Sequence, residues 1–320
     1  MNKALLITTM AFALLLVACG KAEPNPAESA AEKARKAAYQ KEILDWRADR
    51  TRELVAPEGW LSLVGLHFLE PGSSRVGSAA DNGTRLDVGP PHLGIVKLEH
   101  SGALSFDPDP DSGATVDDQP DAGPVPLIAD VDAGEAGPTL VKFNKGDASF
   151  LVIKRGGRYA LRVRDALAPA RTSFPGLAYF GIDPAFRFEA SFKAHPPGTK
   201  LDVMNILSMI EPMDNPGSVS FTHEGEQYTL EAVDEGDHEL FLIFADRTSG
   251  HETYSAARYL YAHYPNAYGK TVVDFNKAYN PPCAFTAFAT CPLPPNANRL
   301  DLAIRAGELK PLKNPLVKLH

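Results

Sequence analysis

The sequence predicts a mainly β protein: an antiparallel β-sandwich or barrel-like domain with one N-terminal amphipathic helix. From Gly59 onward, clusters of Gly, Pro and Asp separate short β-branched and aromatic runs, which is typical of antiparallel strands joined by turns. One longer stretch before Gly59 has helical periodicity instead. Many short strands with a single flanking helix favour a sandwich or a barrel.

The first residues have the pattern of a bacterial lipoprotein signal. Lys3 precedes an apolar run that is too short for an ordinary membrane span and ends in L-V-A-C at Leu16 to Cys19. A small residue directly before this cysteine favours acylation, palmitate included, over a plain secretory peptide. We therefore expect residues 1–18 to be a signal peptide and Cys19 to carry a membrane anchor. The residue after the cysteine is Gly20 and not an aspartate, which favours an anchor in the outer membrane with the protein facing the periplasm. In a host without an outer membrane, the protein would lie at the cell surface.

We expect residues 19–32 to form a tether and residues 33–320 to form a single β-rich domain that includes the helix. The tether is polar and contains prolines. We expect the helix to run from about Ala34 to Leu54, with Pro57 beyond its end. The apolar positions that define its buried face are Tyr39, Ile43, Trp46 and Leu54.

The clearest hairpin is S-F-L-V-I-K-R-G-G-R-Y-A-L-R-V-R, in which Gly156 and Gly157 supply the positive φ angles of a two-residue turn. Its second arm alternates apolar residues, which we expect in the core, with basic residues that face solvent or a site. The basic residues are Arg158, Arg162 and Arg164. Further strands are expected at Gly94–Glu99, Thr139–Asn144, Phe186–Ala194, Ser218–His223, Glu226–Val233, His238–Ala245, Arg258–His263 and Thr271–Phe275.

The stretch from Asp107 to Pro138 is rich in Asp, Gly and Pro and predicts a surface loop or a weak strand pair. Its alternating acids suggest a calcium site, but two intervening prolines and the missing glycine at the sixth position break the EF-hand pattern. A solvated acidic turn is the favoured interpretation. The acids concerned are Asp107, Asp109, Asp111, Asp117 and Asp118.

Composition limits the functions that the chain can have. It has 320 residues, of which 44% are hydrophobic, and a formal net charge of −8. Its basic residues are mostly dispersed among carboxylates, whereas a polyanion partner requires clustered Lys and Arg, so we expect no nucleic-acid partner. The G-x-S-x-G, G-x-G-x-x-G, P-loop and H-E-x-x-H motifs are all missing. We expect no cofactor and no metal.

The run from Asp274 to Pro295 concentrates two cysteines and five prolines in one irregular segment. Once Cys19 is acylated, Cys283 and Cys291 are the remaining cysteines, and an exported protein meets an oxidising compartment, so we expect a disulfide. It would stabilise the loop by about 2 to 3 kcal/mol. The alternative, a metal or haem site that adds His251 or His263 to the thiolates, matches no short-chelate zinc spacing.

A polar pocket is predicted after the apolar strand F-L-I-F-A, in D-R-T-S-G-H-E-T-Y-S-A-A-R and the next strand end. The side chains expected to hold an anion or a sugar-like ligand are Asp246, Thr248, Tyr254, Arg258, Asp274, Asn276 and Tyr279. The alternative is structural: Tyr254 packs, and Arg258 pairs with Asp246 or Asp274 to fix the loops.

Several long strings resemble a bacterial family of domains of unknown function, number 1684, from about Gly59 to the C-terminal end. They are G-W-L-S-L-V-G-L at 59–66, Y-F-G-I-D-P-A-F-R-F-E-A at 179–190, L-F-L-I-F-A-D-R-T-S-G at 240–250, D-F-N-K-A-Y-N-P-P-C-A-F at 274–285, T-C-P-L-P-P at 290–295 and A-G-E at 306–308. Gly181 stands where we expect proline. The resemblance implies no reaction and assigns no catalytic residue.

The leading hypothesis is a lipid-anchored cell-envelope protein whose region from Asp246 to Glu308 binds a small molecule or an envelope component in a polar pocket. One alternative is a hydrolase-like or transferase-like enzyme that uses Asp246 or Asp274 as a general base, with Arg258 holding an anionic group. The other is a structural or assembly lipoprotein that docks through exposed aromatic side chains.

Overall fold

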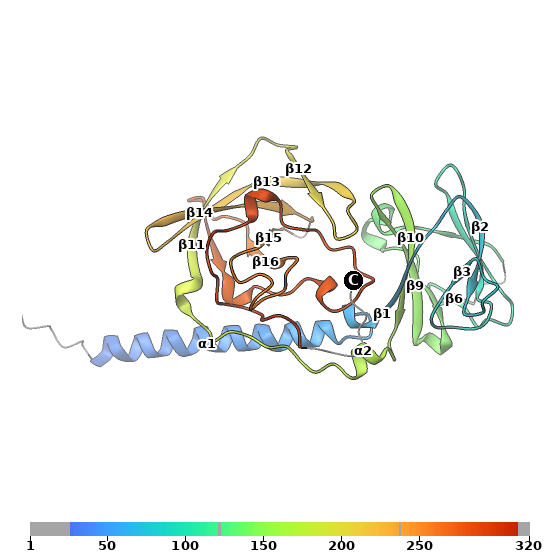
Figure 1. The fold of residues 1–320 in the computed structure, drawn as a ribbon, viewed down its shortest axis with the longest axis horizontal. Helices are drawn as coiled ribbons and strands as arrows, with labels where there is room; N and C mark the ends of the chain where they lie inside the picture. Colours follow the sequence, from blue (N-terminus) through green and yellow to red (C-terminus); the bar gives the residue numbers. More distant parts are fainter. Residues whose placement is uncertain (1–25, 121–122, 237, 313–320) are drawn as a thin grey trace, which may run out of the picture. The chain divides into compact units, whose positions relative to one another are not determined.

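The computed structural model describes residues 26–120, 123–236 and 238–312 (Figure 1). The predicted signal peptide and Cys19 lie outside these ranges. The chain divides into two compact units, residues Met1–Glu42 and Ile43–His320. None of the helices in the described ranges has both the length and the apolar character needed to cross a membrane.

The predicted N-terminal helix is confirmed as α1 (Pro26–Leu54). It ends at Leu54, as predicted, but begins at Pro26, inside the segment that we expected to be a tether. Proline suits the first turn of a helix, because the backbone N–H that it lacks would have no helical acceptor there. Ile43 and Leu54 are completely buried, so the second half of the helix packs against the domain through its apolar face.

The mainly β class is confirmed, and the strands form three sheets. The first has the order β1 (Leu63–Phe68), β10 (Arg158–Asp165), β9 (Ala148–Arg155), β8 (Val141–Phe143) and β6 (Thr115–Val116). The second has the order β3 (Thr84–Arg85), β2 (Gly72–Gly77), β4 (Gly94–Leu98), β5 (Leu104–Pro108) and β7 (Val125–Leu127). Their pairs are antiparallel except for β2 with β3. One apolar core contains residues of both sheets.

The third sheet is barrel-like and nearly closed, and its strands curve around a common centre (Figure 1). Its order is β16 (Arg258–His263), β15 (Glu239–Phe244), β14 (Glu226–Asp234), β13 (Ile210–His223), β11 (Arg187–Ala194) and β17 (Lys270–Asp274), with β12 (Lys200–Met204) paired to β13. The two end strands meet where the Thr271 hydroxyl donates to the carbonyl oxygen of His263 at 2.6 Å.

Short helices occupy the connections. They are α2 (Pro169–Thr172), η1 (Trp60–Ser62), η2 (Asp130–Asp132), η3 (Gly134–Ala136), η4 (Asn144–Gly146), η5 (Pro184–Phe186), η6 (Phe275–Lys277), η7 (Pro282–Ala284) and η8 (Asn296–Asn298). The last three interrupt the C-terminal segment, where the prolines exclude regular strand pairing.

The eight further strands predicted from sequence are all present, as β4, β8, β11 and β13 to β17. Strand β16 has the predicted bounds, and the others have shifted ends. The largest difference is in β13, which begins at Ile210 instead of Ser218. Several short strands were missed, including β1 and β2, which hardly alternate, and β12. The stretch predicted as a surface loop or weak strand pair supplies the short strands β6 and β7, whose Val116 and Leu127 are buried in the first core.

The predicted hairpin is confirmed by β9 and β10. Gly156 and Gly157 adopt φ angles of 55° and 77°, which few other residues would tolerate. Leu161 and Val163 point into the first core, as expected. The opposite face is not a solvent face throughout, because Arg162 is only 8% exposed.

Strand β15 is buried on both sides, which explains its unbroken apolar sequence. Leu240, Leu242 and Phe244 belong to the core inside the barrel-like sheet. Phe241 and Ile243 point the other way, into a layer that also contains Cys283 and Cys291. The irregular C-terminal segment therefore covers the outer face of this sheet.

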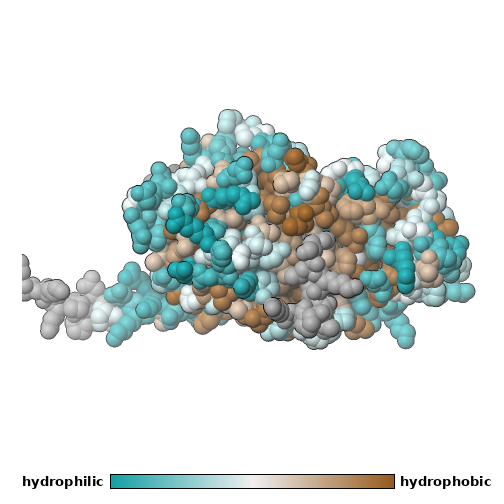
Figure 2. All heavy atoms as spheres, viewed as in Figure 1, coloured by the Kyte–Doolittle hydropathy of each residue, from teal (hydrophilic) through white to brown (hydrophobic). Residues whose placement is uncertain are grey.

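Most of the surface seen in Figure 2 is polar, and apolar side chains gather where β12 turns into β13. Met204 and Ile210 pair across that turn and are 47% and 62% exposed.

Candidate functional site

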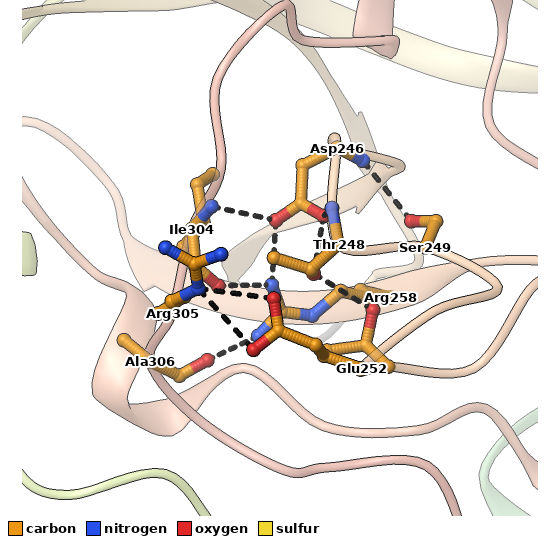
Figure 3. Close-up of polar contacts among 9 residues, drawn as sticks. Asp246, Thr248, Ser249, Glu252, Arg258, Ile304, Arg305 and Ala306 are labelled. Atoms are coloured by element: carbon orange, nitrogen blue, oxygen red, sulfur yellow. Dashed lines mark hydrogen bonds and ion pairs between the residues drawn. The ribbon is translucent and has the colours of Figure 1, made fainter.

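A buried ion pair between Arg258 and Asp246 forms the centre of the predicted polar cluster (Figure 3). Asp246 follows β15 and Arg258 begins β16, so neighbouring strands bring them together. The Arg258 Nη1 lies 2.7 Å from Asp246 Oδ2. The side chains of Arg258 and Asp246 are 1% and 0% exposed. Burial lowers the pKa of Arg258, and the Asp246 carboxylate opposes that shift.

The remaining hydrogen-bonding capacity of this pair is used within the protein. Arg258 donates to the carbonyl oxygen of Ile304 at 2.9 Å and to that of Ala306. Asp246 accepts from the backbone N–H of Thr248 at 2.8 Å, from its hydroxyl at 2.6 Å and from the N–H of Ile304 at 3.2 Å. The pair therefore joins residues 304–306 to the barrel-like sheet.

Asp274 and Asn276 form a second network, at the start of η6. Asp274 accepts from the N–H and the side-chain amide of Asn276 at 3.1 and 3.0 Å, and Arg187 Nε lies 3.4 Å from its other oxygen. Asn276 also exchanges two hydrogen bonds with the backbone of Asp183, at 2.9 and 2.8 Å. This network connects the chain before β11 with the chain after β17.

The two predicted tyrosines are packed against other parts of the C-terminal segment. The Tyr254 hydroxyl donates to the carbonyl oxygen of Cys283 at 3.1 Å. Tyr279 stacks on Tyr261 with ring centroids 6.3 Å apart, and the Arg50 guanidinium carbon lies 4.5 Å from the centre of its ring. Of the seven predicted site residues, Asp246, Thr248 and Arg258 form one group and Asp274 and Asn276 a second, whereas Tyr254 and Tyr279 contact other residues.

Glu308 is a buried acid that the sequence analysis did not assign to the site. Its carboxylate accepts from Arg50 Nε at 3.1 Å and from the N–H of Asn280 at 2.8 Å. Its side chain is 0% exposed. Burial raises the pKa of Glu308, and the positive charge of Arg50 opposes that shift. The sequence contains two signals for this contact: the A-G-E string that ends in Glu308, and Arg50 on the apolar side of the predicted helix. Neither signal identifies the other residue as its partner.

The two cysteines lie side by side as free, buried thiols. The backbone N–H of Cys283 donates to the sulfur of Cys291 at 3.0 Å. Interaction with Cys291 lowers the pKa of Cys283, whereas burial raises the pKa of Cys291. The predicted disulfide therefore stays a prediction. His263 lies beside Glu239, with Nδ1 3.2 Å from Oε1. Within the described ranges, no three His, Cys, Asp or Glu side chains are grouped so as to hold a metal ion.

These features define a class of protein: a barrel-like antiparallel domain whose irregular C-terminal segment is fixed by buried polar side chains. The chain belongs to the family described as "Protein of unknown function (DUF1684)", whose model matches residues 172–309. The match contains the barrel-like sheet and the C-terminal segment, whereas the part of the resemblance between Gly59 and Arg171 lies outside it.

A search of solved structures found an uncharacterized protein from Haloarcula marismortui, determined by solution NMR. It is 33% identical to this chain, with a TM-score of 0.37, over 43% of this chain and 78% of that protein. A search of curated proteins found no match.

The buried ion pair yields a first prediction. Arg258→Ala leaves the Asp246 carboxylate buried without its counter-charge, so it should lower the free energy of unfolding by about 3 to 5 kcal/mol. Urea denaturation of the purified protein measures this loss. The matched control is Arg247→Ala, because Arg247 pairs with Asp301 at the surface, where their side chains are 61% and 83% exposed. That change should cost less than about 1 kcal/mol; equal costs for the two variants would contradict a structural role for the buried pair.

A second prediction concerns Gly307, which precedes Glu308 and has a φ of 81°. A Cβ atom there would collide with the carbonyl oxygen of Ala278 and lie 2.8 Å from that of Phe275. Gly307→Ala should therefore cost about 3 kcal/mol or more, because strain and crowding add. Gly225→Ala is the control: its φ is 89°, but nothing lies within 4 Å of the added carbon. That variant should lose only about 1 to 2 kcal/mol, and thermal unfolding of both would show whether the close approach matters.

Proposed function

We propose that this chain is a lipid-anchored cell-envelope protein, held in the outer membrane and facing the periplasm, that binds a small molecule or an envelope component through its C-terminal segment. The observation that supports binding best is that this segment is irregular yet fixed by buried hydrogen bonds. Asn298, for example, is 1% exposed and makes three bonds to the backbone of Glu231 and Ile243, at 2.7, 2.9 and 2.8 Å.

Rigid loops suit recognition because a ligand does not then have to order them on binding. Asn276, Asn280 and Glu308 fix other points of the same segment, and each is no more than 1% exposed. A core closed by regular strands would need fewer buried polar side chains than this irregular segment contains. This amount of fixed, irregular backbone is typical of segments that carry binding residues.

The enzyme alternative requires Asp246 or Asp274 to take a proton from a substrate. A general base must lie within hydrogen-bond reach of that proton. The Asp246 side chain is 0% exposed, and both of its oxygens accept hydrogen bonds from the protein. The Asp274 side chain is 7% exposed and accepts from Asn276. These arrangements favour a role for both acids in fixing the loops.

The scaffold alternative requires exposed aromatic side chains in the cysteine-containing loop. Phe275 and Phe285 are 0% and 4% exposed. Tyr279 is partly buried and Phe288 is too, so none of the four aromatic residues expected on such a surface is fully exposed. Their burial favours a ligand site over a docking surface.

Native mass spectrometry of the mature chain, purified from membranes in detergent without reductant, tests this proposal. We expect a lipid mass on Cys19 and a non-covalently bound small molecule that is lost on unfolding. An unmodified Cys19 would contradict the anchor. A chain that carries no small molecule in any preparation would contradict the binding function.

We also propose that Cys283 and Cys291 form a disulfide after export, which their adjacency and an oxidising compartment support. Reduction should then lower the free energy of unfolding by about 2 to 3 kcal/mol, because the unfolded chain loses a constraint. Urea denaturation with and without reductant measures this. The double variant Cys283→Ala with Cys291→Ala should not respond to reductant. Two free thiols in unreduced wild-type protein would contradict the pairing.

A further inference from the structure

The basic face of β10 contains two buried polar groups that have no hydrogen-bond partner among the described residues. Side chains alternate along the strand, so Arg158, Arg162 and Arg164 point away from the first core, which receives Leu161 and Val163. Arg158 is at the exposed end of this row and pairs with Glu70 at 3.3 Å. The other two arginines are covered by neighbouring parts of the chain.

Arg162 lies beside the cysteine-containing loop. It is 8% exposed, and its guanidinium carbon lies 5.4 Å from the centre of the Trp60 ring. Its Nη2 is 3.4 Å from the hydroxyl of Thr290, a long hydrogen bond. Its Nε–H is buried and has no acceptor among the described residues. The Nε–H of this guanidinium is therefore a buried donor without an acceptor in the described part of the chain.

Arg164 repeats this arrangement two residues further along the strand. It is partly buried, and its Nε–H also lacks an acceptor in the part of the chain that the structure describes. Asn205 adds a third buried donor, because its Nδ2 lacks an acceptor there too. Asn205 bridges to Pro292, and the N–H of Ile206 donates to the carbonyl oxygen of Cys291, so Asn205 borders the same loop as Arg162.

In the described ranges, neither Arg162 nor Arg164 forms an ion pair. Two acids act on them from further away: Asp130, already paired with Arg155 at 2.7 Å, opposes the pKa shift of Arg162, and Glu58 opposes the lowering of the pKa of Arg164 by burial. Burial, together with the positive charges of Arg155 and Arg164, lowers the pKa of Arg162 to about 10. A buried guanidinium without a counter-charge is costly, and it is normally paired. What these donors lack is a negatively charged acceptor.

We propose that Arg162 and Arg164, with Asn205 bordering the same loop as Arg162, bind the oxyanion group of a small molecule, a phosphate or a carboxylate. The inference rests on the proposed binding function, for which it names a place and a chemical class. The planar guanidinium fork matches two oxygens of such a group, and these charge-assisted bonds are the strong ones.

Titration of the mature chain with inorganic phosphate and with succinate, at constant ionic strength, tests the proposal by thermal shift and calorimetry. We expect at least one of the two anions to raise the melting temperature of the wild type. Its dissociation constant should rise about tenfold or more in Arg162→Met and in Arg164→Ala, since each removes charge-assisted bonds. Glycerophosphoglycerol, the free headgroup of phosphatidylglycerol, is the third probe: preference for it indicates a lipid source, and preference for the other two indicates a soluble ligand.

The matched control is Arg158→Ala, on the same face of the same strand, which should change the dissociation constant less than about twofold because that side chain is exposed. Arg162→Met removes a buried, unpaired charge and keeps much of the volume, so its melting temperature in anion-free buffer should equal or exceed that of the wild type. A large loss there would show that Arg162 serves the fold.

The outcomes separate this inference from the proposed function. If the native spectrum contains a ligand that stays bound in both arginine variants, the oxyanion site is wrong and the binding function stands. If no anion stabilises the wild type and no ligand is found, both fail. If Arg158→Ala and Arg164→Ala weaken anion binding equally, the binding results from general surface charge, and the proposed site is wrong.

Discussion

The ion pair between Arg258 and Asp246 is the interaction on which the C-terminal half depends. Two charges taken out of water repay their desolvation only when the geometry is good and the remaining hydrogen bonds are made. Here the carboxylate accepts from Thr248 and Ile304, and the guanidinium donates to Ile304 and Ala306. Because two of these partners belong to a segment without strands, the pair incorporates that segment into the core and fixes the position of Glu308.

Glu308 extends this dependence to the N-terminal helix. Its carboxylate binds Arg50, a residue 258 positions away, and Arg50 in turn lies over the ring of Tyr279 and donates to the carbonyl oxygen of Asn280 at 3.0 Å. The second half of α1 is therefore held by a charged contact as well as by Ile43 and Leu54. Apolar packing is non-directional, whereas a hydrogen-bonded pair fixes the rotation of the helix about its axis. The polar contacts thus define the arrangement that the apolar core stabilises.

Local patterns predicted much of the fold, because they report local physics. The glycine pair gave the hairpin, the unbroken F-L-I-F run gave a strand buried on both sides, and the alternation along β10 separated its core face from its basic face. The partner of each polar residue could not be predicted in the same way. Arg258 was expected to pair with Asp246 or Asp274, and spacing could not decide between the two acids. Arg50 and Glu308 carry no signal that joins them across 258 positions. Strands such as β1 and β2 were missed because their side chains hardly alternate and their pairing is set by distant strands.

Two buried arginines of this chain differ in their hydrogen bonding. Arg258 and Arg162 are the same residue type, 1% and 8% exposed, and burial lowers the pKa of both. Arg258 has a carboxylate and two carbonyl oxygens around it, so nothing further is needed to satisfy it. Around Arg162 are a ring, one hydroxyl at 3.4 Å, other arginines and Asp130, which is already paired with Arg155. A protein that needed only rigidity would gain from an apolar side chain at that position. Keeping a guanidinium there is a cost that the proposed bound anion would offset.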